Sequence, residues 1–129
     1  MIEGLLDRVM AWASSRRDLR AVVLVGSHAR GTARPDSDVD LMLLTERPRD
    51  LTDDLSWVNE LGTVDRLELE SWGRVTSVRA WYAGGPEVEF SLATPDWVKQ
   101  PDEGTRRVLG DGYRVLLDRD EIFSARRTT

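Results

Sequence analysis

The stretch "VGSHARGTARPDSDVDLMLL", Val25–Leu44, decides the fold because it joins two apolar runs through a polar segment rich in glycine and aspartate. The first run, Ala21–Val25, ends at Gly26, and the second run is Val39–Leu44, with Asp40 near its start. Short continuous apolar runs rich in valine and leucine are typical of strands buried on both faces of a sheet. The stretch therefore predicts two neighbouring buried strands whose polar residues meet at one edge of the sheet.

The segment between the two predicted strands offers a place for an anion. Ser27 stands where the N-cap of a short helix is expected, and Pro35 ends that helix because proline does not fit a helix interior. A glycine lets the backbone approach an oxygen closely, and the following hydroxyl and backbone N–H groups can donate hydrogen bonds to it. We therefore expect Gly26 and Ser27 to hold phosphate groups.

The residue types exclude a P-loop. Gly26 and Gly31 have the glycine spacing of G-x-x-x-x-G-K-[ST], but Thr32 stands where the lysine belongs. Lys99 is the single lysine of the chain and lies far along the sequence. Any mechanism that needs a catalytic lysine would have to use Lys99.

Two aspartates at the start of the second strand predict a metal site. Asp38 and Asp40 are two residues apart, so in an extended chain their carboxylates point to the same side. Like charges held close together repel each other, and a cation would neutralise them. Oxygen ligands without cysteine suit Mg²⁺ or Mn²⁺. The competing interpretation is a solvated turn before a strand, but it leaves the glycine and serine after the preceding strand unexplained.

The rest of the chain predicts an α+β (α/β-like) domain, a mixed sheet of about five strands flanked by helices, over residues 1–129 as one domain. Helical spacing of apolar residues favours a first helix over residues 2–17, and residues 47–62 predict a loop followed by a helix. Alternating patterns favour three antiparallel strands, with a turn at 83–86. The ranges of these strands are 64–72, 74–82 and 86–94, followed by short helices near 95–97 and 104–109 and a last strand at 113–117.

The excess of acidic residues limits the kinds of partner that we expect this protein to bind. The chain has 129 residues, a net charge of -5 at pH 7 and no cysteine. A surface of this charge does not favour binding to nucleic acid, although an acidic protein can bind a nucleotide through divalent cations. The first twenty residues lack the apolar core of a signal peptide or a membrane span. We expect a cytoplasmic protein with neither nucleic-acid nor membrane partners.

The quoted stretch resembles the G-S-x(n)-D-x-D signature of the DNA polymerase β-like nucleotidyltransferase superfamily, in particular the minimal and the aminoglycoside nucleotidyltransferases. The matching positions are Gly26, Ser27, Arg30, Gly31, Asp38 and Asp40. The resemblance implies an enzyme in which an acceptor hydroxyl attacks the α-phosphorus of a nucleoside triphosphate and pyrophosphate leaves. It also implies Mg²⁺ (or Mn²⁺) as the cofactor, and ATP as the expected donor because family members commonly use it.

The resemblance also assigns roles to residues. Asp38 and Asp40 would bind the metal, and Gly26 and Ser27 would hold the β- and γ-phosphates. Arg30 would pair with the triphosphate or with the leaving pyrophosphate.

The family has a third carboxylate on a later strand, and its candidate here is Glu89 in "EVEF", as a metal ligand or as the general base. Most relatives have aspartate at this position. Glu87 on the same side of the strand and Asp65 in "TVDRL" are the alternatives for the third acid. Glu87 and Glu89 also fit the solvent face of an alternating strand. His28, the single histidine, is expected to be an exposed loop residue.

The sequence leaves the acceptor open. About forty residues follow "EVEF", which is little room for a second helical domain that would bind the acceptor. One interpretation is a transferase that modifies a protein, with a small helical partner or as a homodimer. A second is a transferase for a small molecule. The alternative from another class is a catalytically weak domain that binds a nucleotide or a partner, such as the antitoxin-like half of a two-protein system.

Overall fold

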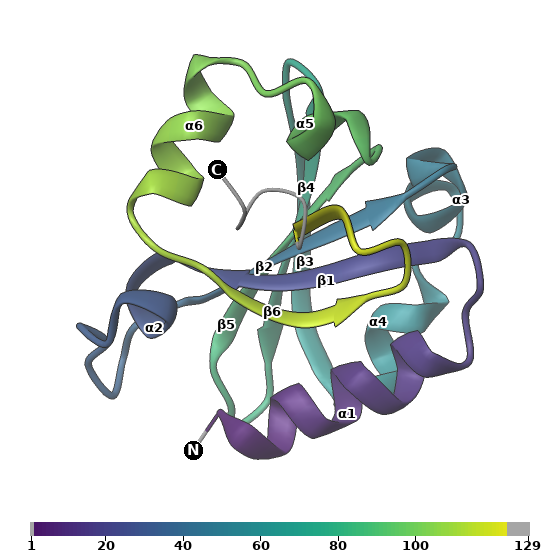
Figure 1. Cartoon of the computed structure of the whole chain (residues 1–129). Coiled ribbons are helices and arrows are strands. Elements are labelled where there is room, and N and C mark those ends of the chain that lie inside the picture. The colour runs from purple at the N-terminus through teal and green to yellow at the C-terminus, as the bar shows by residue number, and fades with distance from the viewer. Residues whose placement is uncertain (1, 124–129) are drawn as a thin grey trace.

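A mixed sheet forms the centre of the molecule, with six strands in the order β3-β4-β5-β2-β1-β6 (Figure 1). The computed structural model describes residues 2–123. Strands β2 and β5 run parallel, and the other neighbouring strands run antiparallel. The strands are β1 Leu19–Val25, β2 Val39–Thr45, β3 Val64–Trp72, β4 Val75–Tyr82, β5 Glu87–Ala93 and β6 Arg114–Asp118. The helices are α1 Glu3–Ser14, α2 Gly26–Arg30, α3 Pro48–Asp53, α4 Ser56–Glu60, α5 Asp96–Lys99 and α6 Glu103–Gly110.

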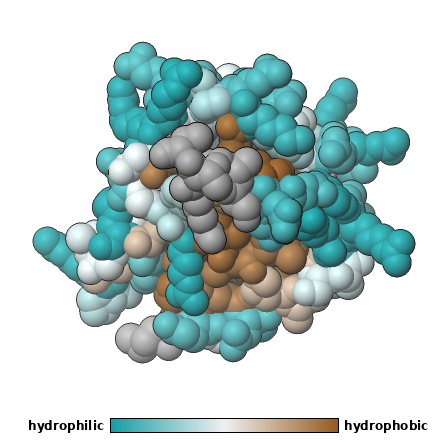
Figure 2. All heavy atoms as spheres, viewed as in Figure 1, coloured by the Kyte–Doolittle hydropathy of each residue, from teal (hydrophilic) through white to brown (hydrophobic). Residues whose placement is uncertain are grey.

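This architecture confirms the predicted α+β class and the antiparallel meander β3-β4-β5. The two strands predicted to be buried on both faces, β1 and β2, lie side by side inside the sheet and are almost fully buried. The sheet has six strands rather than about five because β6 adds to the outer side of β1. Figure 2 shows apolar side chains at the surface in the region of β6, whose Val115, Leu116 and Leu117 are only partly buried, with polar side chains around them.

Helices cover both faces of the sheet. In Figure 1, α1 and α4 lie on one side of the sheet, and α5 and α6 lie on the other. The larger core is on the side of α1, where Trp57 stacks on Trp12 at 4.9 Å between ring centroids and meets the edge of Phe90 at 5.0 Å. The smaller core on the side of α5 and α6 includes Trp97 and Leu109. Trp12, Trp57 and Trp97 are therefore core residues.

Local structure differs from the sequence prediction in three places. The first helix ends at Ser14 rather than at residue 17. The prediction that Ser27 caps the short helix is wrong, because α2 begins one residue earlier, at Gly26, and has no side-chain cap. Residues 47–62 form two short helices instead of a loop and one helix, and Asp54 lies between them, where its carboxylate accepts a hydrogen bond from the backbone N–H of Ser56 at 3.0 Å.

Within residues 2–123, no helix combines the length and the apolar composition that crossing a bilayer requires. The longest of them, α1, has 12 residues and buries one stripe against the sheet.

The core on the α1 side should carry much of the stability. Phe90 is fully buried, whereas Leu69 on β3 is 46% exposed. Replacing a buried phenylalanine by alanine leaves a cavity, so we expect Phe90→Ala to lower the free energy of unfolding by about 3–5 kcal/mol. Leu69→Ala should change it by no more than about 0.5 kcal/mol. Urea unfolding followed by circular dichroism measures both, and equal effects would contradict this assignment of the core.

Candidate functional site

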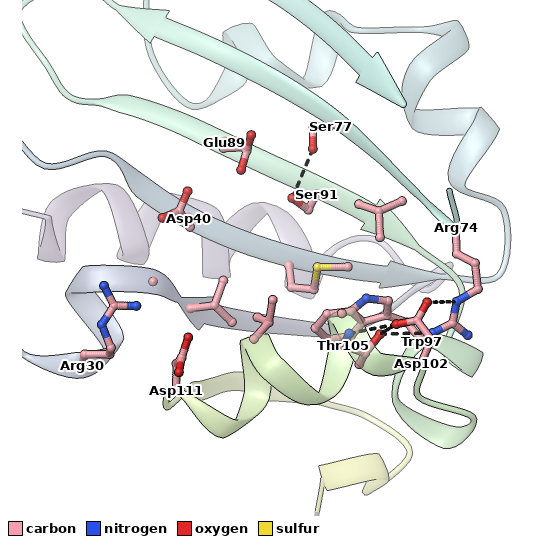
Figure 3. Close-up of a pocket in the computed structure, with 16 residues that line it drawn as sticks. Arg30, Asp40, Arg74, Ser77, Glu89, Ser91, Trp97, Asp102, Thr105 and Asp111 are labelled. Atoms are coloured by element: carbon pink, nitrogen blue, oxygen red, sulfur yellow. Dashed lines mark hydrogen bonds and ion pairs between the residues drawn. The ribbon is translucent and has the colours of Figure 1, made fainter. Parts of the chain in front are cut away.

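The register of three strands places charged residues in a row across the sheet. Asp40 on β2 lies opposite Glu89 on β5, and Glu89 lies opposite Arg79 on β4. Residues that are paired across neighbouring strands point to the same face. Figure 3 shows the side chains of Asp40 and Glu89 next to each other on the face that also meets α6. The predicted third acid on β5 is thus a direct neighbour of the predicted metal ligand on β2.

The turn from β1 into α2 brings the backbone against Asp40. Gly26 has a φ of 74°, which favours glycine, and a Cβ at this position would overlap Oδ2 of Asp40 and lie 3.2 Å from its Cγ. Gly31 ends the helix with a φ of 76°, and its backbone N–H donates to the carbonyl of Ser27. The helix is therefore a single turn that stands directly beside the Asp40 carboxylate.

Arg79 is bound by three acidic side chains. Its Nη1 lies 3.2 Å from Oδ2 of Asp38 and also contacts Glu87, and its Nη2 lies 2.7 Å from Oε2 of Glu89. Burial opposes the charge of Arg79, but the hydrogen bond to Glu87 and the charge of Glu89 hold its pKa above the ordinary value. Arg79 is thus the local counter-ion of the acidic residues.

Asp40 differs from its neighbours because no hydrogen bond from residues 2–123 reaches its carboxylate, although the side chain is half-buried. Burial, followed by the charges of Glu89 and Asp38, raises the pKa of Asp40 to about 6. A carboxylate in this environment is stabilised by a cation. The oxygen atoms of Asp38, Asp40 and Glu89 therefore fit a divalent metal ion by their chemistry. In the described part of the chain no three acidic side chains already converge on one point as in a formed metal site.

A cavity of about 550 Å³ extends from the acidic residues along the face of the sheet toward α5 and α6. One end is lined by Gly26, Arg30 and Asp40, and Figure 3 shows Arg30 reaching toward this end from α2. The other end is lined by Trp97, Arg74 and Asp102 among others, and Nε of Arg74 lies 3.3 Å from Oδ2 of Asp102 there (Figure 3). The cavity thus has Arg30 beside the acidic residues at one end and the ion pair of Arg74 with Asp102 at the other.

The Arg30 end of this cavity contains most of the residues predicted from the sequence. Gly26, Arg30, Asp40 and Glu89 line the cavity. Ser27 lies on the same helical turn as Gly26. Asp38 joins the group through Arg79 rather than by lining the cavity.

Two residues considered in the sequence analysis lie elsewhere or in a different environment. Asp65 is exposed on β3, and β4 and β5 separate that strand from β2, so the fold does not bring it to the other acids. The expectation that His28 is an exposed loop residue is wrong, because it is half-buried on α2 and its Nε2 is buried without a partner in the described range 2–123.

Sequence reasoning missed Arg79. It is a charged residue inside the β-branched and aromatic stretch "RVTSVRAWY", which was a visible signal. What the sequence did not reveal is the register that sets Arg79 opposite Glu89, since a shift by one residue would turn its side chain to the other face.

The comparison with known families decides where the chain belongs. The model of the nucleotidyltransferase domain family matches residues 10–80, more than half of the chain. The chain belongs to this family. The match includes Gly26, Ser27, Asp38 and Asp40 and ends before Glu89, so the nucleotidyltransferase motif identified in the sequence is confirmed, and the position of the third acid depends on geometry alone.

One of two similar solved structures shares the fold of this chain. An aminoglycoside 6-adenyltransferase from Bacillus subtilis superposes with a TM-score of 0.61 at 12% identity, over 74% of this chain and 36% of that one. A cytoplasmic RNA terminal U-transferase has a TM-score of 0.42 at 23% identity, over 66% of this chain and 26% of that one. The likeness to the adenyltransferase shows a shared fold, and this chain spans about a third of its length. None of the curated proteins matches the sequence.

Gly26 and Gly31 form a matched pair for a test of the turn. Both have a φ near 75°, but a Cβ at Gly31 would meet no atom within 4 Å, whereas one at Gly26 would overlap Asp40. We expect Gly31→Ala to cost the backbone strain alone, about 1–2 kcal/mol, and Gly26→Ala to cost at least about 1 kcal/mol more. Urea unfolding measures both variants. Equal losses would mean that the overlap with Asp40 is relieved without cost.

The raised pKa of Asp40 predicts how stability depends on pH in the metal-free protein. Its folded pKa of about 6 exceeds the ordinary value of 3.8, so folding favours the neutral acid. That contribution is complete below about pH 4 and is lost as the pH rises through about 6. Relative to Asp40→Asn, the wild type should therefore lose about 1–3 kcal/mol between about pH 4 and pH 7, at the lower end where solvent screens the site. Unfolding in EDTA across this range measures the difference, and parallel curves for the two proteins would refute it.

Proposed function

We propose that the chain is a metal-dependent nucleotidyltransferase that transfers a nucleoside monophosphate from a nucleoside triphosphate, with ATP as the donor, to a hydroxyl group. The observation that carries the proposal is the juxtaposition of Asp40 and Glu89 on neighbouring strands, beside the Gly26 turn and at one end of a cavity. Membership of the nucleotidyltransferase family supports the reaction type.

The residues divide between the metal and the phosphates. Asp38, Asp40 and Glu89 would hold Mg²⁺ (or Mn²⁺), and a bound divalent ion would stabilise negative charge on the attacking and leaving oxygens. The backbone and hydroxyl at Gly26 and Ser27 would bind the β- and γ-phosphates. Arg30 lines the same end of the cavity, where its guanidinium would pair with the triphosphate and then with the leaving pyrophosphate.

The reaction balances with the groups at this site. The oxygen of the acceptor hydroxyl forms a bond to the α-phosphorus, and the bond from the α-phosphorus to the bridging oxygen of pyrophosphate breaks. Glu89, if it is not a metal ligand, would take the proton of the acceptor hydroxyl as general base, since it is paired with Asp40 across the strands and lines the cavity. Holding both reactants across the acidic pair lowers the entropic cost of bringing them together.

The end of the cavity opposite Arg30 supports a small-molecule acceptor. Arg30 and Gly26 occupy one end, so the space beyond Glu89, between the sheet and α6, is left for the acceptor (Figure 3). The hydroxyls of Ser77 and Ser91 lie 3.4 Å apart there and can donate to or accept from an uncharged polar group. A space lined on two sides suits a compact molecule better than an extended protein segment. Modification of a protein, with a helical partner or as a homodimer, is the alternative acceptor mode.

A catalytically weak domain that binds a nucleotide or a partner is the second candidate. Two observations favour it: glutamate stands at the third acidic position, and Arg79 is paired with Asp38 and Glu89. The aspartate pair argues for catalysis, since a domain that only binds a partner has no need of two adjacent carboxylates. The cytoplasmic location, the single-domain organisation over residues 1–129 and the absence of nucleic-acid and membrane partners stay predictions from composition.

Substitution of the aspartates tests the proposed chemistry. Asp38→Asn and Asp40→Asn should abolish the release of pyrophosphate from ATP and Mg²⁺, because the metal loses a charged ligand. Both variants should remain folded by circular dichroism. Asp65→Asn is the matched control, since Asp65 is exposed on β3 away from the site, and it should keep the wild-type rate. Wild-type rates in the doubly substituted protein (Asp38→Asn with Asp40→Asn) would refute the assignment.

Binding without turnover separates the two candidate functions. In a thermal unfolding experiment, a transferase should be stabilised by a nucleoside triphosphate only when Mg²⁺ is also present, since binding of a ligand to the folded state raises the melting temperature. The absence of metal-dependent stabilisation by any common nucleoside triphosphate would favour the partner-binding candidate.

A further inference from the structure

Arg79 is placed among more acidic side chains than its single charge can neutralise. Asp38, Glu87 and Glu89 contact its guanidinium directly, and Asp40 lies beside Glu89 without a hydrogen bond from the described residues. Three of these four carboxylates contact one guanidinium, and the charges of Arg79 and Arg30 both act on the fourth, Asp40. The cluster is held together in the metal-free protein by Arg79, because the acids would otherwise repel one another.

The strand β4 fixes the position of this arginine. Arg79 pairs in register with Glu89, and the next pair along the same two strands is Ala80 with Val88. Val78 and Ala80, the residues on either side of Arg79, are fully buried on the opposite face of the sheet. The base of the Arg79 side chain cannot shift along the strand without moving these core residues, so its guanidinium stays within reach of the acids.

The three acids bound by Arg79 are not equivalent. Asp38 and Glu89 belong to the proposed metal site, and one guanidinium nitrogen faces each of them. Glu87 lies two residues before Glu89 on the same face, one step further from Asp40 along β5. A guanidinium that leaves Asp38 and Glu89 can therefore keep its contact with Glu87.

We propose that Arg79 is an internal cation that holds the carboxylate cluster together until a divalent metal ion displaces it from Asp38 and Glu89, while Glu87 retains the guanidinium. The inference rests on the proposed function, because it assumes that these acids bind the metal. Asp40, which has no hydrogen bond to Arg79, is open to the ion first. Glu87 is thereby a positioning residue that acts through Arg79 and is not a metal ligand.

The arrangement has opposite consequences for assembly and for affinity. Arg79 keeps the carboxylates close together before the metal binds, which stabilises the metal-free fold. It also competes with the metal for the same oxygen atoms, so each binding event must break charge-assisted hydrogen bonds to Asp38 and Glu89. Removing Arg79 should therefore destabilise the metal-free protein and, at the same time, tighten metal binding.

The test is Mn²⁺ binding to the nucleotide-free protein, measured by calorimetry or by the electron paramagnetic resonance of free Mn²⁺. Arg79→Gln should bind Mn²⁺ about tenfold more tightly than the wild type, and its melting temperature in EDTA should fall. Arg79→Lys retains a positive charge and should stay closer to the wild type in both measurements. Arg20→Gln is the matched control: Arg20 pairs with Asp120 at the other end of β1, so this variant should leave Mn²⁺ binding unchanged.

Substitution of Glu87 is a second test, which can first be made in a protein that keeps Arg79. Glu87→Gln should weaken Mn²⁺ binding several-fold, because Arg79 then loses the acid that it contacts outside the proposed metal site. Glu68, which lies opposite Arg79 on β3, is already ion-paired with Arg66. The same substitution should have no effect in the Arg79→Gln background, whereas a direct metal ligand would lower affinity in both backgrounds.

The outcomes separate this inference from the proposed function. Mn²⁺ binding to Arg79→Gln at wild-type affinity or weaker, or an effect of Glu87→Gln that persists without Arg79, would overturn the displacement mechanism and leave the metal site standing. If Arg79→Gln does not fold, an unchanged Mn²⁺ affinity of Glu87→Gln would by itself overturn the displacement mechanism. Absence of Mn²⁺ binding to wild type and variants would overturn both the inference and the metal-dependent function.

Discussion

The parallel pairing of β2 with β5 is the constraint on which the candidate site depends. It sets Asp40 beside Glu89, and a slip by one residue would bring an apolar side chain to one of the two positions. The register is secured on the opposite face of the sheet, where Leu41 and Phe90, the next residues along each strand, are fully buried and paired with each other. The apolar core under the sheet thus fixes the distance between two like charges on top of it.

The apolar packing on one face of the sheet explains how the unfavourable proximity of carboxylates on the other face persists. Carboxylates side by side in a half-buried position oppose folding at neutral pH, as the raised pKa of Asp40 indicates. The burial of Phe90 against Trp57 stabilises the same strands by several kcal/mol, on the order expected for a large aromatic side chain. Charged groups that chemistry needs are therefore held on rigid strands rather than on loops, which keeps their geometry within narrow limits.

Much of the fold could be predicted from the sequence, since the two apolar runs around Gly26 and Asp40 and the alternating pattern after Thr63 specify strands by local chemistry alone. The aspartate pair, the glycine turn and the acid in "EVEF" could likewise be read from residue types. The parts that were missed depend on pairing between distant segments. The residues of "RVTSVRAWY" do not indicate that Arg79 faces Glu89 on the following strand. The expected cap at Ser27 failed because the required close approach to Asp40 places glycine at the first helical position.

The contact between Gly26 and Asp40 also has a meaning for sequence variation. Thirteen intervening residues separate the two positions along the chain, yet the space that a side chain at position 26 would need is the space that the Asp40 carboxylate fills. A side chain at position 26 would require the Asp40 carboxylate to move, whereas a change at position 40 leaves the glycine undisturbed. The second aspartate therefore restricts which residues position 26 can accept, and the glycine of the turn places no such restriction on position 40.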